Sequence, residues 1–179
     1  MVKGLRFYMV KSKKYKIIIR NGELLLKNFF TYNWQVRQEW FEWCKHVRGE
    51  ELTKSRVGGV GSILETLFHI VEVEYSWIRA IQRKEDIVVT FEEYDTLEKI
   101  MSLSKRYEEE ITEFLNGDLF EMKNEHVYIP WDKNTYIVDD ILHHLVAHEI
   151  HHIGQLSVWA RELGKRPVPA NFIGRNIRK

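Results

Sequence analysis

The sequence predicts an all-α protein, a four-helix bundle with a short β-like crossover before its last helix and a basic N-terminal extension. Four long segments carry apolar residues at helical spacing. Glycine, proline and Asn-Gly signals separate these segments. A chain of 179 residues is long enough for one good core. We therefore expect residues 1–22 to form the extension and residues 23–179 a single domain.

The first helix is expected from Glu23 to about Val47, where Gly49 follows. The basic residues before it include the stretch KIIIR and end at Asn21-Gly22, a turn signal. This extension is expected to be a strand or a loosely packed tail. The candidate buried stripe of the helix consists of Phe30, Trp34, Val36, Phe41, Cys44 and Val47.

The second helix is expected from about Ser62 to about Arg83. Ser62 and Glu65 have the spacing of a capping box, which satisfies backbone donors at a helix start. The preceding stretch RVGGVG has three glycines, but no Gly-Lys-Ser/Thr follows it. This disfavours a phosphate-binding loop, so the segment is better explained as a helix start.

The third helix is expected from Tyr94 to Leu115, and the Asn-Gly pair at 116–117 closes it. The stretch EHVYIPWDKNTYIV is rich in aromatic and branched residues around a turn at 132–134. It predicts a small hairpin or an extended crossover. The fourth helix is expected from Val138 to Leu163, because Gly164 and two later prolines stop it.

Composition narrows the function classes. The net charge of +1 gives no argument for a nucleic-acid or membrane partner. No apolar run approaches the roughly 18 residues needed to span a bilayer, and no long apolar signal-peptide region is present. The only cysteine, Cys44, cannot form an internal disulfide and has the spacing of a core residue. We expect a cytoplasmic protein.

Five of the eight histidines lie within the ten residues HHLVAHEIHH. At about 100° per residue, His148 and His152 share a face with Ile141 and Leu145, one turn apart. Burying two imidazoles without partners costs a few kcal/mol, which a shared divalent cation removes. The competing interpretation is that both are core histidines bonded to neighbours or solvent.

An open metal site needs a third protein ligand. His69 in the second helix is the candidate, provided that the second and fourth helices face each other. Glu72, one turn later, is either an orienting partner of His69 or a surface carboxylate. His144 and His151 lie at the edge of the apolar stripe, and either is a candidate for a ligand that closes the site.

Residues 148–152 also match HExxH, in which two histidines bind zinc and the glutamate acts as general base. The longer metzincin pattern fails, because Gln155 and Val158 stand where its glycine and histidine belong. Glu149 lies about 60° from His152 and about 100° from His148 on the helix. It is therefore expected to flank the site, which disfavours a peptidase.

Three segments together resemble the DinB family, bacterial four-helix proteins named after a damage-inducible gene. FFTYNWQVRQEWFEW is similar to the first helix and SILETLFHIVEVEYSWI to the second, with its ligand histidine at His69. LHHLVAHEIHHIGQLSVWARELG follows the family pattern H-x-x-x-H-x-x-H-H-R-G-Q. The matched positions are His144, His148, His151, His152, Gly154 and Gln155. Where the pattern has arginine, this chain has Ile153, which lies away from the ligand face. The resemblance covers roughly residues 25–165.

The resemblance implies a bundle with one divalent metal ion, which we expect to be zinc or nickel, bound by His69, His148 and His152. Family members include metal-dependent thiol transferases and isomerases that use low-molecular-weight thiols. We therefore expect a metal-dependent thiol S-transferase or hydrolase, which uses a metal-bound thiolate or water and accepts a small electrophile. We also expect a homodimer. The alternatives are a non-catalytic stress or binding protein stabilised by metal and, less favoured, an HExxH zinc peptidase.

Overall fold

The computed structural model describes residues 13–117 and 119–177, with side chains from residue 24 onward except at position 120. Four long helices form the bundle: α1 (Lys13–Cys44), α3 (Ile63–Ile81), α4 (Leu97–Asn116) and α6 (Val138–Glu162). Short elements join them: α2 (Gly49–Thr53), η1 (Phe91–Tyr94), α5 (Leu119–Met122), β1 (His126–Ile129) and β2 (Asn134–Ile137). The all-α fold class is confirmed. None of the described helices combines the length and apolarity needed to cross a membrane.

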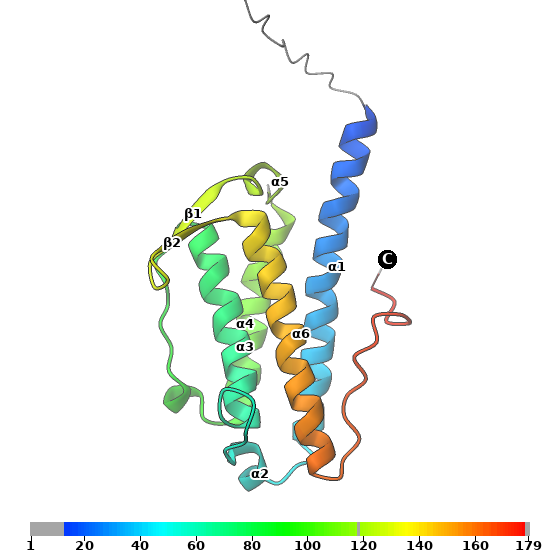
Figure 1. Ribbon diagram of the computed structural model, residues 1–179, viewed down its shortest axis with the longest axis vertical. Helices are drawn as coiled ribbons and strands as arrows, with labels where there is room; N and C mark the ends of the chain where they lie inside the picture. Colours follow the sequence, from blue (N-terminus) through cyan, green and yellow to red (C-terminus); the bar gives the residue numbers. More distant parts are fainter. Residues whose placement is uncertain (1–12, 118, 178–179) are drawn as a thin grey trace, which may run out of the picture.

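The helices pack so that α6 contacts both α1 and α3, while α4 contacts the same two helices from the other side (Figure 1). The Tyr75 ring of α3 stacks on Tyr107 of α4, with ring centroids 3.5 Å apart. The core between the helices is mostly apolar, although it also holds buried polar residues such as Arg37. Its largest fully buried side chains include Phe30, Trp40, Phe41, Ile63, Leu67, Ile78, Ile100 and Trp159.

The hairpin predicted from the sequence is confirmed. β1 and β2 pair antiparallel, with Val127 opposite Tyr136 and Ile129 opposite Asn134. β2 leads directly into α6, so the hairpin caps the end of the bundle where α3 stops (Figure 1). Ser62 caps α3 by accepting a bond from the Glu65 amide at 3.2 Å. The Glu65 carboxylate lies against Gly61.

The predicted start of the first helix is wrong. α1 begins at Lys13, ten residues earlier than expected, and runs through the Asn21-Gly22 pair. A glycine inside a helix costs only about 1 kcal/mol, which a helix of this length tolerates. Residues 13–22 of the predicted extension thus belong to α1, and residues 1–12 lie outside the described residues. The division into extension and domain at residue 22 otherwise stays a prediction.

The segment after α6 returns along α1 (Figure 1). Tyr32 donates its hydroxyl hydrogen bond to the Ala170 carbonyl at 2.8 Å, and Arg175 pairs with Glu39 at 2.7 Å. The Phe172 ring lies 5.3 Å from the Tyr32 ring. The C-terminal segment therefore packs on α1, whereas the candidate histidines lie on α3 and α6.

Candidate metal centre

Three histidines converge from two helices. His148 Nε2 lies 3.2 Å from His69 Nε2 and 3.1 Å from His152 Nε2. One ligand atom of each residue lies within 4.8 Å of the others, a grouping that could hold a metal ion. The His152 ring is buried, whereas the His69 and His148 rings are partly exposed. The cluster is therefore anchored in the bundle on one side and open to solvent on the other.

The packing of α3 against α6 brings the cluster together. The two helices are antiparallel, because His69 meets His148 while Trp77, further along α3, meets His144, which is earlier in α6. This arrangement supplies the condition that the sequence left open for His69. The three residues predicted as ligands are therefore brought together by the fold.

The distances fit one ion. Two nitrogens that each lie about 2.0–2.1 Å from a tetrahedral zinc are about 3.3 Å apart. The two measured separations from His148 Nε2 are close to this value. Imidazole nitrogen also suits nickel, copper and iron, so the donor set fits a first-row divalent cation without selecting one.

Gln155 fixes the orientation of the His152 ring. Its Oε1 accepts a hydrogen bond from His152 Nδ1 at 2.7 Å, and its Nε2 donates to His151 Nε2 at 3.0 Å. With the proton on Nδ1, His152 presents the Nε2 lone pair to the cluster. A polar partner on the far nitrogen is the usual support of a ligating histidine.

The hydrogen-bonding capacity of the three rings also favours a cation. His148 Nε2 is close to two other Nε2 atoms, but one N–H can donate along only one of these directions. At least one of the two close contacts therefore lacks a linear hydrogen bond, because it sets two lone pairs or two N–H groups against each other or shares one N–H. A cation bound by the three nitrogens would satisfy all three lone pairs at once.

The rings are neutral at neutral pH, as metal ligands must be. Burial, followed by the nearby histidines, lowers the pKa of His148 to about 3. Burial and His152 lower the pKa of His69, and burial lowers that of His152. No ring therefore needs to lose a proton at neutral pH before it binds a cation.

The other candidate ligands lie outside the cluster. His151 is exposed and contacts Gln155, and the exposed His144 ring packs 5.5 Å from the Trp77 ring. Neither belongs to the group of ligand atoms described above. Glu72 accepts a weak bond from Ser76 at 3.4 Å, so an orienting contact with His69 has no support.

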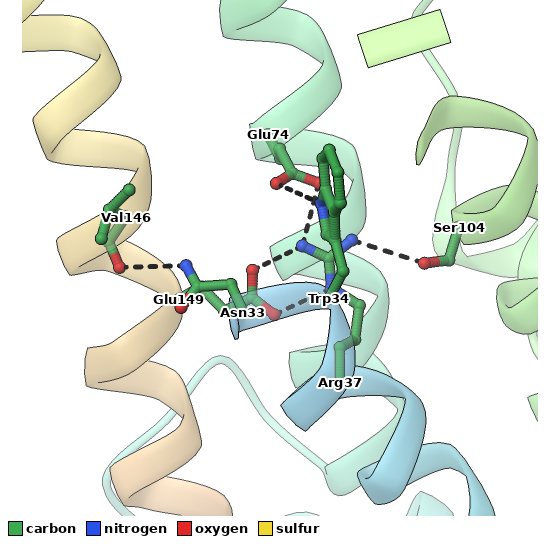
Figure 2. Close-up of polar contacts among 7 residues, drawn as sticks. All are labelled: Asn33, Trp34, Arg37, Glu74, Ser104, Val146 and Glu149. Carbon is green, nitrogen blue, oxygen red and sulfur yellow. Dashed lines mark hydrogen bonds and ion pairs between the residues drawn. The ribbon is translucent and has the colours of Figure 1, made fainter. Parts of the chain in front are cut away.

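Glu149 faces the bundle interior and not the histidines. Its two carboxylate oxygens accept bonds from Arg37 Nε at 2.9 Å and Nη2 at 2.5 Å (Figure 2). A zincin glutamate must reach the water beside the metal, whereas both oxygens of this one are bonded to Arg37. The peptidase alternative therefore loses its general base.

Arg37 links α1 to the other three long helices through this buried network, which includes a bond from its Nη1 to Ser104 of α4 at 3.4 Å (Figure 2). Its Nη2 also contacts Glu74 at 2.9 Å, and Trp34 Nε1 donates to the other Glu74 oxygen at 3.0 Å (Figure 2). Arg37, Glu74 and Glu149 are 1%, 5% and 2% exposed. Burial raises the pKa of Glu74 to about 7, against the opposing effect of the Arg37 charge.

The sequence-based prediction placed His148 on the buried face of the last helix. In the structure the centre of this face includes Leu142, Leu145 and Glu149, and His148 lies at its edge. Sequence reasoning missed the roles of Arg37, Glu74 and Gln155. For Gln155 a signal was present, since it lies one turn after His151 and three residues after His152.

Comparisons with known proteins place the chain beside one family and one relative. The model of the DinB family matches residues 16–177. An uncharacterized protein, YizA, from Bacillus subtilis (strain 168) is 57% identical over 154 residues. The match covers 86% of this chain and 97% of that relative.

Proposed function

The chain belongs to the DinB family, and from that premise we propose that it is a metal-dependent enzyme with His69, His148 and His152 as ligands. One observation carries the proposal: three Nε2 atoms from two helices meet where two of the rings are partly exposed. A zinc ion usually takes four ligands, so three histidines leave a position for an exogenous molecule. Zinc or nickel is the ion we propose.

The reaction we propose is transfer of a low-molecular-weight thiol to a small electrophile, with hydrolysis as the second candidate. A divalent ion at this site would favour the deprotonated form of a thiol or water bound beside it. In S-transfer the thiol proton passes to solvent, sulfur bonds to the electrophilic carbon, and the leaving group departs with its electron pair. The three neutral imidazoles would hold the ion without cancelling its charge.

The thiol must come from outside the chain. Cys44 is the last residue of α1 and is fully buried in the core of the bundle. Burial raises the pKa of its thiol to about 12. A thiol of this kind is neither accessible nor ionised at neutral pH. This supports an exogenous thiol as cosubstrate.

A non-catalytic metal-stabilised protein is the alternative, because an ion held by His69 and His148 would staple α3 to α6. Thiol binding separates the two functions. Protein loaded with Co(II) is titrated with small thiols while the sulfur-to-metal charge-transfer band is followed. We expect a band in the wild type and in Cys44→Ala, and none in His148→Ala. The absence of a band with every thiol would contradict S-transfer and favour the structural role.

A further inference from the structure

A pocket of about 370 Å³ lies beside the histidine cluster, between the end of α3, β2 and the start of α6. It is lined by Trp77, Asp132, Tyr136, Asp140, Ile141 and His144. None of these side chains is needed to explain the metal ligands. The pocket is large enough for a small organic group.

His144 connects the pocket to the cluster. Its ring lies 5.8 Å from the His148 ring and 5.5 Å from the Trp77 ring. Trp77 follows His69 by about two turns of α3, and His144 precedes His148 by about one turn of α6. A molecule with one end at the cluster can therefore place its other end in the pocket.

Aromatic rings form one wall of the pocket. The Trp77 and Tyr136 ring centroids are 6.0 Å apart, with the ring planes at 53°. Trp131 packs its ring at 89° to Trp77, with centroids 5.6 Å apart, and so supports Trp77 from outside the pocket. Faces of tryptophan and tyrosine attract organic cations through the ring quadrupole.

The charge of the lining has the matching sign. Asp132 and Asp140 are its charged residues, and no lysine or arginine is among the described residues that line it. Asp132 accepts hydrogen bonds from the Tyr136 hydroxyl and from Asn134 Nδ2, which hold its carboxylate in place. The two carboxylates would repel an anionic group in this pocket, and they would give a neutral apolar group no electrostatic attraction.

We propose that this pocket binds an organic ammonium group, and that the substrate of the histidine cluster carries such a group at the end remote from its metal-binding atom. The first part stands on the pocket alone. The second part rests on the proposed function. The substrate class is thus a small zwitterionic or cationic thiol.

Choline tests the first part on metal-free protein, with tryptophan fluorescence and NMR line broadening as readouts. The comparison ligand is its neutral carbon isostere, in which a quaternary carbon replaces the nitrogen. We expect choline to bind about tenfold more tightly than the isostere, as a cation–π contact together with two nearby carboxylates predicts. Equal affinities, or no binding of choline, would overturn the proposal.

Matched variants locate the binding. Tyr136→Leu and Asp140→Asn should each weaken choline binding by about fivefold or more. Tyr128→Leu, on the facing strand, and Asp139→Asn, in the same first turn of α6, should leave it unchanged, because neither residue lines the pocket. Asp139→Asn also controls for the favourable effect of a carboxylate on the helix dipole. Equal losses in the pocket variants and the controls would contradict the assignment.

The second part is tested with Co(II)-loaded protein. Thiols that carry a trimethylammonium group on alkyl chains of increasing length are compared with their neutral carbon isosteres. At one chain length the ammonium thiol should give the charge-transfer band at about a tenfold lower concentration, and Asp140→Asn should remove this advantage. No advantage at any length would overturn the second part. If choline binds but no thiol gives a band, the proposed function fails and the ammonium pocket stands.

Discussion

His148 and Glu149 are consecutive in α6, yet they serve two separate clusters. His148 Nε2 lies 3.2 Å from His69 Nε2, whereas both carboxylate oxygens of Glu149 bond to Arg37. Successive helical residues point about 100° apart, which carries one side chain to the α3 edge and the other to the core. Metal binding and the buried ion network can therefore be perturbed independently.

Glu149→Gln should leave metal stoichiometry unchanged and reduce stability. The amide keeps one acceptor for Arg37 but loses the charge, which we expect to cost about 1–3 kcal/mol in the free energy of unfolding. Urea denaturation and metal analysis of the same preparations measure the two effects. The wild type should have no peptidase activity. Proteolysis that disappears in Glu149→Gln would instead support the HExxH mechanism.

Arg37→Met should destabilise the protein by about 3–5 kcal/mol, because it leaves two buried carboxylates without their cation. Replacing Glu74 and Glu149 by leucine in the same chain should restore part of this loss, since an apolar core needs no ion pair. Urea unfolding of the single and triple variants makes the comparison. An Arg37→Met variant with the unfolding free energy of the wild type would show that the network does not stabilise the packing of α1 on α3 and α6.

The raised pKa of Glu74 predicts how the free energy of unfolding should depend on pH. Burial raises its folded-state pKa from 4.5 to about 7, so between these values the folded protein holds more protons than the unfolded chain. The contribution of this carboxyl is therefore fully present below about pH 4.5 and declines as pH rises towards about pH 7. Glu74→Gln should remove that decline in wild-type-minus-variant unfolding free energies. A difference that does not vary with pH would contradict the raised pKa.

Gln155→Leu should weaken metal binding by about 10–100-fold while helical circular dichroism stays unchanged. The reason is that His152 loses the acceptor that holds its Nδ1 proton and its ring orientation. His151→Ala is the matched control, because it removes only the outer contact of Gln155 and should have a smaller effect. Competition with a chelator measures both affinities. A larger loss in His151→Ala would reassign His151 as a ligand.

Helical periodicity located the helices that carry the site with good accuracy. The fourth helix was predicted to start at Val138, where α6 does start, and Ser62 was identified at the cap of α3. The early start of α1 was missed because Asn21-Gly22 matches a turn signal. In the structure the helix continues through this pair. The family resemblance and the i, i+4 spacing together singled out His148 and His152.

The polar core could not be predicted in the same way. A count based on apolar residues gives Glu149 no weight as a core residue, and so it shifted the buried face of α6 towards the histidines. Only the approach of Arg37, more than a hundred positions away in the chain, makes a glutamate stable at that place. The facing of α3 and α6, which joins His69 to His148, likewise depends on tertiary packing and leaves no local pattern.

The metal content of protein purified without a histidine tag tests the central claim most directly. We predict about one divalent ion per chain in the wild type, and the same in the control His143→Ala, whose exposed ring lies outside the cluster. His152→Ala should lose tight binding, and His69→Ala should weaken it while the helical circular dichroism persists. Full metal content in both His69→Ala and His152→Ala would contradict the assignment of these histidines as ligands.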